Sequence, residues 1–112
     1  MKNLHDVSNL QELLIALKHQ SQPMFINLCS RCGQENYLMD QVVSNLQEDY
    51  GTKLGFEKLP STASEVIKTE LMISKNPVLL LIEQGEIKAV FGGIVAQHKL
   101  EQALQKLYNN IH

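Results

Sequence analysis

Two cysteines, Cys29 and Cys32, are the residues of this chain best suited to chemistry, and Ser30 and Arg31 lie between them. A cysteine thiolate is a strong nucleophile and also a metal ligand, so either use would suit such a pair. In a reducing compartment, two cysteines more often serve redox chemistry than a structural disulfide. Any chemistry of this chain is therefore expected at Cys29 and Cys32, with redox use favoured over a structural disulfide.

Charged neighbours and a helix start would tune the reactivity of these thiols. The unpaired N–H groups at a helix N-terminus stabilise a thiolate, and Arg31 adds a full positive charge directly before Cys32. The carboxylate of Glu35 would act in the opposite sense if it points at the sulfur, because a negative neighbour raises a thiol pKa. We expect the pKa of Cys32 to lie below the ordinary value of about 8.5.

Metal binding is the less favoured use of the two cysteines. Zinc sites take four ligands, and iron–sulfur clusters usually take four cysteines. The histidines that could join a set show no ligand spacing, and they are His5, His19, His98 and His112. We expect no metal and no bound organic cofactor. A further interpretation is that both cysteines are inert packing residues.

Length and charge narrow the class of protein. The chain has 112 residues, 44% of them hydrophobic, which suits a single domain over residues 1–112 with its own core. A net charge of −2 with scattered basic residues predicts no nucleic-acid or anionic-membrane partner. No apolar run approaches the ~20 residues of a membrane span, and nothing at the N-terminus resembles a signal peptide. We expect a cytoplasmic monomer.

The elements around the cysteines alternate between helix and strand. Apolar spacing predicts a helix capped by Ser8 that ends near residues 19–22, and a buried strand over 24–28. A helix over 33–50, with an apolar stripe that includes Leu38, follows the cysteines. The remaining expectations are a strand over 53–59, a helix after Pro60 carrying Val66, Ile67 and Leu71, strands over 78–82 and 87–91 joined by a turn, and a last helix from Leu100 to Ile111.

This order predicts an α/β fold. A strand, helix and strand in succession form a right-handed parallel crossover, and the last two strands form an antiparallel hairpin. The expected architecture is a three-layer sandwich with a mixed central sheet of about four strands and helices on both faces.

The chain resembles the thioredoxin family over residues 8–111. Three features carry the resemblance. They are Cys29-Ser30-Arg31-Cys32 between a buried strand and a helix, the segment Asn76-Pro77-Val78-Leu79-Leu80-Leu81, and the hairpin Glu83-Gln84-Gly85-Glu86 followed by Gly92-Gly93. The resemblance implies a thioredoxin-like fold, a cis peptide bond before Pro77, and binding of an extended partner segment by the backbone of Asn76. It also implies an oxidoreductase that exchanges disulfides of proteins or small thiols with a thiol reductant.

The chain departs from the thioredoxin pattern at several positions. It has no tryptophan, and Ser30-Arg31 replaces the glycine-proline pair between the cysteines of thioredoxins. Asn27 occupies the place of the buried acid in the strand before the motif, and an asparagine cannot shuttle a proton. A non-catalytic binding or adaptor module of the same fold is therefore an alternative function.

Two registers of the motif are possible. In one, Cys29 is the nucleophile and Cys32 the resolving thiol. In the other, which helix length and the separation from Pro77 favour, Cys32 is the nucleophile and Glu35 takes the resolving position. The second register resembles the monothiol bacilliredoxin-type proteins, which would need Cys32 alone.

Overall fold

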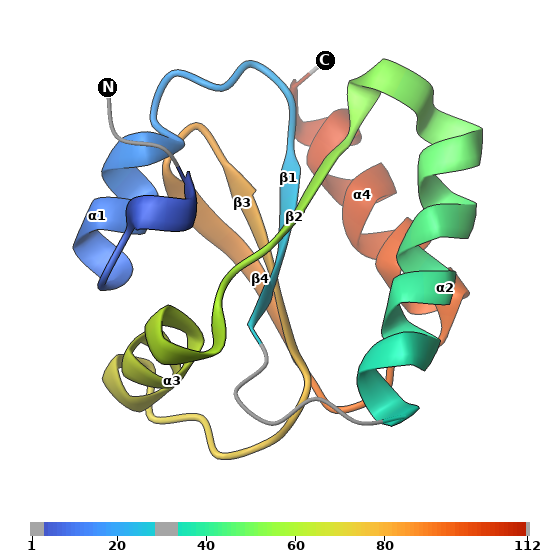
Figure 1. Ribbon diagram of the computed structural model, residues 1–112. Helices are drawn as coiled ribbons and strands as arrows, with labels where there is room; N and C mark the ends of the chain where they lie inside the picture. The colour runs from blue at the N-terminus through green and yellow to red at the C-terminus, as the bar shows by residue number, and fades with distance from the viewer. Residues whose placement is uncertain (1–3, 29–33, 112) are drawn as a thin grey trace.

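A computed structural model describes residues 4–28 and 34–111 of the chain. Helices and strands alternate along these residues, with short 3₁₀ helices at Leu4–Asp6 and Gly51–Lys53 (Figure 1). The longer elements are α1 (Leu10–Ala16), β1 (Met24–Leu28), α2 (Gln34–Tyr50), β2 (Gly55–Lys58), α3 (Ser61–Glu70), β3 (Val78–Glu83), β4 (Glu86–Gly92) and α4 (Gln97–Ile111).

The described strands form one mixed sheet in the order β2-β1-β3-β4. β1 runs parallel to β2 and antiparallel to β3, and β3 runs antiparallel to β4. Leu28 at the end of β1 lies opposite Val78 at the start of β3. This is the mixed four-stranded sheet that the sequence predicted. Its two central strands, β1 and β3, are neighbours although they are distant in the sequence.

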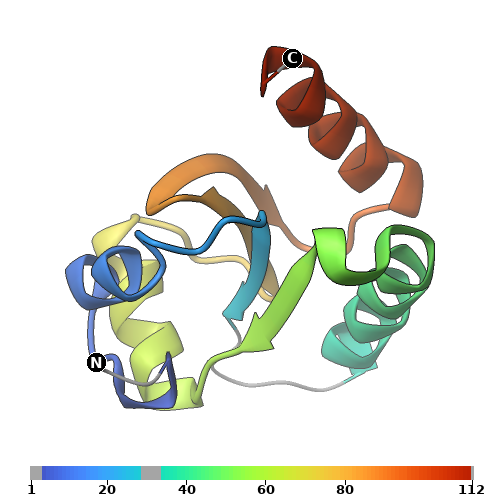
Figure 2. The ribbon, with the colours of Figure 1, turned by 90° about the horizontal axis from the view of Figure 1, so that it is seen from above.

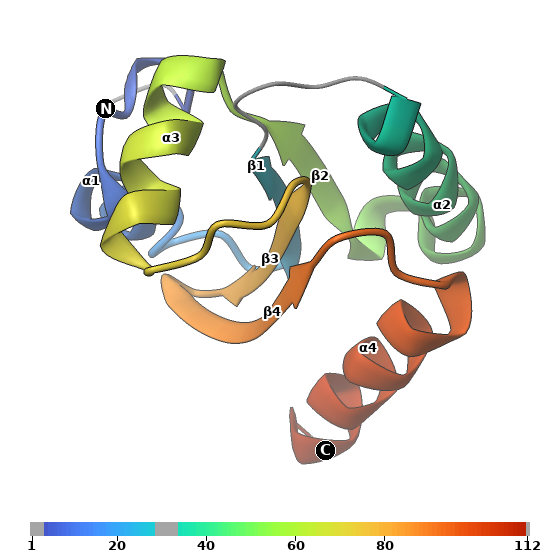
Figure 3. The same ribbon diagram turned by 90° about the horizontal axis from the view of Figure 1, so that it is seen from below.

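Helices cover both faces of the sheet and create two apolar cores. α1 and α3 lie on one face and α2 and α4 on the other, as the views from above and below show (Figures 2 and 3). Side chains of the central strands alternate between the two cores, because successive residues of a strand point to opposite faces. Leu80 belongs to the core under α1 and α3, and its neighbour Leu79 belongs to the core under α2 and α4.

The first helix differs from the prediction at both ends. Its N-cap is Asn9 rather than Ser8, because Asn9 Oδ1 accepts a hydrogen bond of 2.9 Å from the backbone N–H of Glu12. The Glu12 carboxylate in turn accepts from the backbone N–H of Ser8, which satisfies a second donor at this end. The helix ends at Ala16, earlier than predicted, since the N–H of Lys18 bonds to Ile15 in a tighter turn.

The second strand is shorter than predicted, and the hairpin is close to the prediction. β2 begins at Gly55 because residues 51–53 form a 3₁₀ helix. In the β3–β4 turn, Gln84 and Gly85 have φ angles of 50° and 80°, the left-handed pair of a type I′ turn. A Cβ on Gly85 would lie 2.9 Å from the backbone oxygen of Leu14, so α1 packs directly against this turn.

Two residues of the predicted helix stripes are exposed instead of buried. Leu38 on α2 and Val66 on α3 each keep 45% of their surface exposed. Among the residues of α2 whose burial the structure describes, the buried ones are Met39, Val43 and Leu46, at spacings of four and three. Leu38 lies about 100° around the helix from Met39 and so falls outside that face.

Candidate active site

The candidate site lies where β1 ends, α2 begins and β3 begins, at the lower end of the sheet in Figure 1. Cys29, Arg31 and Cys32 follow β1 directly and lie outside the described residues, as does the side chain of Glu35. Their roles, and the choice between the two registers, stay predictions. Asn76 and Pro77 are described, and they lead straight into β3. Because Leu28 pairs with Val78, the end of β1 and Pro77 lie at the same end of the two central strands.

The Asn76–Pro77 peptide bond is cis, the form that the resemblance implied. The Pro77 carbonyl accepts a hydrogen bond of 2.8 Å from the N–H of Gly93, which ties the segment to the end of β4. Within the described residues, the backbone N–H and C=O of Asn76 have no hydrogen-bond partner. Asn76 is an exposed residue.

A lysine that the sequence analysis did not single out contacts this segment. Lys68 on α3 is only 6% exposed, and its Nζ donates a hydrogen bond to Asn76 Oδ1. Burial lowers the pKa of Lys68 from its ordinary value of 10.5, while the nearby Glu65 carboxylate opposes that shift. Lys68 lies three residues before Leu71, which belongs to the predicted apolar stripe of this helix, and this helical spacing was the signal that could have predicted its burial.

Asn27, in the place of the family's strand acid, is buried beside a carboxylate from another element. Its side chain is 1% exposed, and Nδ2 donates a hydrogen bond of 3.4 Å to Asp40 Oδ1 on α2. Lys58 at the end of β2 donates to the other oxygen of Asp40 at 2.6 Å. An acid therefore lies next to the expected position, although it is carried by a helix. The sequence contains no local signal for this pairing, because its members come from three separate elements.

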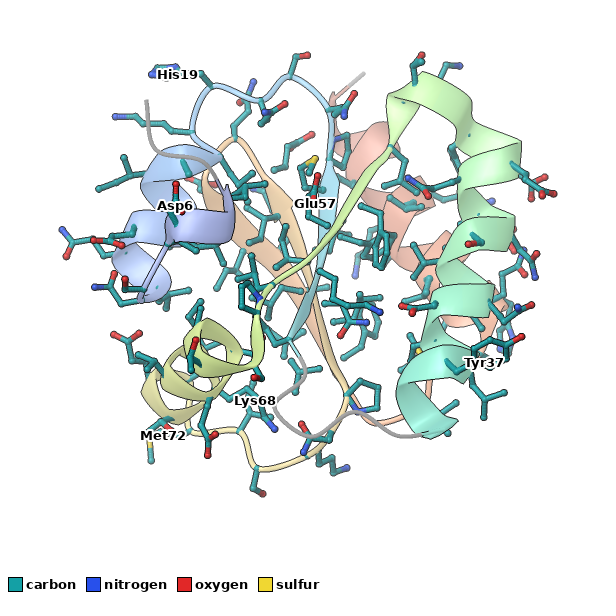
Figure 4. All side chains as sticks on the ribbon, in the orientation of Figure 1. Asp6, His19, Tyr37, Glu57, Lys68 and Met72 are labelled. Atoms are coloured by element: carbon teal, nitrogen blue, oxygen red, sulfur yellow. The ribbon has the colours of Figure 1, made fainter. Side chains whose placement is uncertain are left out.

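Exposed apolar side chains lie near the start of α2. Tyr37 and Leu38 in α2 are 62% and 45% exposed, and Ile94 after β4 is 53% exposed. The backbone N–H of Val95 lies 3.3 Å from Met39 Sδ, so the segment after β4 contacts the first turns of α2. Tyr37 and Lys68 lie at the same end of the molecule, on helices that cover opposite faces of the sheet (Figure 4).

Among the described residues, neither a metal cluster nor the pocket beside α4 involves Asn76 or Pro77. Within the described part of the chain, no group of three His, Cys, Asp or Glu residues could hold a metal ion. A pocket of about 480 Å³ lies between β4 and α4, lined by Phe91, Lys99 and Lys106 among others. None of its lining residues is Asn76, Pro77 or Lys68. No helix among the described residues is long and apolar enough to cross a membrane.

Comparisons with known proteins rest on structure. No family model and no curated protein matches the sequence. Desulfothioredoxin from Desulfovibrio vulgaris Hildenborough is similar with a TM-score of 0.68 and 16% identity, over 83% of this chain and 88% of that chain. Mitochondrial thioredoxin 3 from Saccharomyces cerevisiae is similar with a TM-score of 0.68 and 22% identity, over 89% of this chain and 92% of that chain. A malarial protein is similar with a TM-score of 0.64 and 15% identity, over 76% of this chain and 96% of that chain.

These likenesses establish the class of fold. The predicted thioredoxin-like architecture is confirmed: this chain has the thioredoxin fold, with a four-stranded mixed sheet between two helical layers in its described residues. The likeness to bacilliredoxin-type proteins stays a prediction, because neither the comparisons nor the described residues bear on it.

Proposed function

We propose that the protein is a thiol–disulfide oxidoreductase that acts through Cys29 and Cys32 on disulfides of proteins or small thiols. The observation that carries the proposal is the thioredoxin fold, in which the pairing of Leu28 with Val78 brings the Asn76–Pro77 segment next to the end of β1, the strand that the cysteines follow in the sequence. This juxtaposition would bring a bound segment alongside the residues after β1. The reducing cytoplasm is the compartment that suits such chemistry.

The proposed reaction is a pair of thiol–disulfide exchanges. The thiolate of the nucleophilic cysteine attacks one sulfur of the substrate disulfide; a new S–S bond forms, and the other substrate sulfur leaves as a thiolate. The second cysteine, or an external thiol, then attacks the mixed disulfide and releases the remaining substrate sulfur. The substrate is reduced by two electrons, and a dithiol reductant returns the protein to its starting state.

The backbone of Asn76 and the nearby apolar residues support a polypeptide substrate. An extended segment could hydrogen-bond to the main chain of Asn76 as an added strand would, which would bring its disulfide toward the residues that follow β1 in the sequence. Tyr37 and Leu38 at the start of α2, and Ile94 next to the Gly93 that bonds to Pro77, offer exposed apolar area. Such area favours a protein over a small, highly charged thiol.

Insulin reduction with dithiothreitol as donor tests the proposal. We expect the protein to accelerate the reaction, and Cys32→Ser to abolish the acceleration. Cys29→Ser separates the mechanisms: a two-cysteine enzyme loses multiple turnover, whereas a monothiol enzyme keeps activity with an excess of small thiol. Ser30→Ala is the matched control in the same segment and should remain active. A wild-type protein that never exceeds the rate of dithiothreitol alone contradicts the proposal.

A non-catalytic adaptor is the second candidate. The buried Asn27, in place of an acid, and the exposed Tyr37, Leu38 and Ile94 favour it. An adaptor would hold its partner without exchanging disulfides, so the Cys32→Ser variant would bind that partner as tightly as the wild type. Loss of binding in Leu38→Asp, with both cysteines intact and insulin reduction absent, would support the adaptor.

A further inference from the structure

Lys68 is a buried cation whose place in the fold the exchange chemistry does not explain. Lysine is rarely this buried unless its charge is paired. The buried side of α3 consists of Ala63, Ser64, Ile67 and Lys68, and the Lys68 ammonium lies beneath the segment that precedes β3. Among the described residues, its one hydrogen-bond acceptor is Asn76 Oδ1, and no carboxylate forms an ion pair with it.

This contact fixes the orientation of the Asn76 carboxamide. A lysine ammonium has only donors, so the oxygen of the carboxamide must face it. The Nδ2 group, with its two N–H donors, then points away from Lys68. Asn76 is exposed, and no acceptor among the described residues takes those two N–H groups.

We propose that Lys68 is a positioning residue that turns the Asn76 carboxamide so that its N–H groups face the bound substrate. The group that they recognise is a backbone carbonyl of an extended peptide next to the disulfide. This inference rests on the proposed exchange function and adds to it a specificity for substrates with a hydrogen-bond acceptor at that position. Without Lys68, the Asn76 carboxamide could turn either way. In one of the two orientations its oxygen would face the carbonyl oxygen of the substrate, and two acceptors form no hydrogen bond.

Lys68→Met is the first test, because methionine keeps an unbranched side chain of similar length and removes the donors. We expect KM for a disulfide-containing peptide to rise about three- to tenfold with kcat unchanged, the factor of one ordinary hydrogen bond. Asn76→Ala should raise KM by a similar factor. The double variant should show no further rise, because both changes remove the same interaction.

Two lysines serve as controls. Lys99→Met removes an exposed lysine on α4 and should leave KM unchanged. Lys75→Met removes a positive charge adjacent to Asn76 without removing the hydrogen bond to its side chain. If Lys75→Met raises KM as much as Lys68→Met does, charge near the site explains the effect and the positioning role is overturned. Additive effects in the Lys68→Met, Asn76→Ala double variant would overturn it as well.

Asn76→Asp keeps the test decisive if Lys68→Met does not fold. Aspartate retains an acceptor for Lys68 but has no N–H donor, so the variant should fold and still show the raised KM. An unchanged KM in Asn76→Asp would contradict a donor role for this side chain.

Nuclear magnetic resonance gives a readout that needs no activity. The side-chain amide signals of Asn76 in ¹⁵N-labelled protein should move toward free-asparagine positions in Lys68→Met and stay unchanged in Lys99→Met. Signals that do not move in Lys68→Met overturn the positioning role even in an active enzyme. If wild-type protein fails to reduce insulin while these signals do move, the exchange function fails and the orientation of Asn76 by Lys68 stands.

Discussion

At the scale of single residues, the candidate site depends on polar side chains that are held by elements other than their own. Asn27, Asp40 and Lys58 come from β1, α2 and β2, and Lys68 reaches Asn76 from α3. Each pair joins a buried or half-buried group to a partner that the fold brings near. Removing one member therefore affects stability and the geometry of the site together.

The pH dependence of stability tests the burial of Lys68. Because the folded-state pKa lies below the ordinary 10.5, the unfolded chain holds the proton over a pH range in which the folded chain has lost it. The free energy of unfolding of the wild type should therefore rise relative to that of Lys68→Met as pH increases through that range toward about 10.5. Urea titrations at several pH values measure the difference, and groups common to both proteins, such as Tyr50, cancel. A difference independent of pH would contradict the lowered pKa.

Asp40→Ala tests the pairing beneath the site. It removes both the hydrogen bond from the buried Asn27 and the ion pair with Lys58, so we expect a loss of about 1–2 kcal/mol in the free energy of unfolding. Glu86→Ala is the matched control, since it breaks an exposed Lys88–Glu86 pair of 2.9 Å and should change the free energy of unfolding much less. Urea denaturation measures both. Equal small losses would show that Asn27 does not depend on Asp40.

The sequence predicted some of these residues and not others. Asn76 and Pro77 were predicted because they stand in a local motif before a strongly apolar strand. Asp40 and Lys68 were not, because their importance comes from contacts between elements that lie many residues apart. Only for Lys68 did the sequence contain an indication: it lies on the buried side of an amphipathic helix, where a charged residue is unusual.

At the scale of elements, turn geometry and helix caps decide where each helix and strand stops. Gly85 and Gly93 both have φ near 80°, a conformation that side chains with a Cβ adopt at a cost. Their surroundings differ, since a Cβ at Gly85 would meet α1 and one at Gly93 would meet nothing within 4 Å. Substitutions at these two glycines therefore separate the cost of backbone strain from the cost of steric conflict.

Alanine at each glycine tests this difference. We expect Gly93→Ala to lower the free energy of unfolding by about 1–2 kcal/mol, the cost of the left-handed backbone. Gly85→Ala should lose more, because its Cβ would also lie 2.9 Å from the Leu14 oxygen. Chemical denaturation of both variants gives the comparison. A Gly85→Ala variant no less stable than Gly93→Ala would mean that the turn moves away from α1 freely.

Element types were easier to predict than element ends. The strand over 24–28 was predicted correctly because five apolar or small polar residues precede the cysteines without interruption. The end of α1 and the start of β2 were wrong because short 3₁₀ turns at Leu17 and Gly51 replaced regular structure. Such turns depend on a balance of single hydrogen bonds, which apolar periodicity does not report.

At the scale of the whole molecule, β1 and β3 are shared by two cores and should make the fold one cooperative unit. Leu79 and Leu80 are neighbours in β3, yet they fill opposite cores. Each is fully or almost fully buried, so replacing either by alanine should cost about 2–5 kcal/mol.

The three tyrosines make this cooperativity measurable. Tyr37 and Tyr50 lie in α2 and Tyr108 lies in α4, so tyrosine fluorescence reports on one helical layer. We expect Leu80→Ala, in the opposite core, to shift the fluorescence midpoint in urea by as much as the circular dichroism midpoint. Leu79→Ala is the control on the tyrosine side. Separate midpoints for the two signals in Leu80→Ala would show two independently unfolding layers.

The placement of β1 between β2 and β3 also has a consequence for how the chain is made. The ribosome releases β1 first, and its partner β3 follows about 50 residues later, which takes roughly 3–10 s at ordinary translation rates. During that interval the apolar segment Met24–Leu28 has no β3 to pair with. We therefore expect this segment to be the part of the nascent chain that chaperones bind, and its release to coincide with synthesis of residues 78–83.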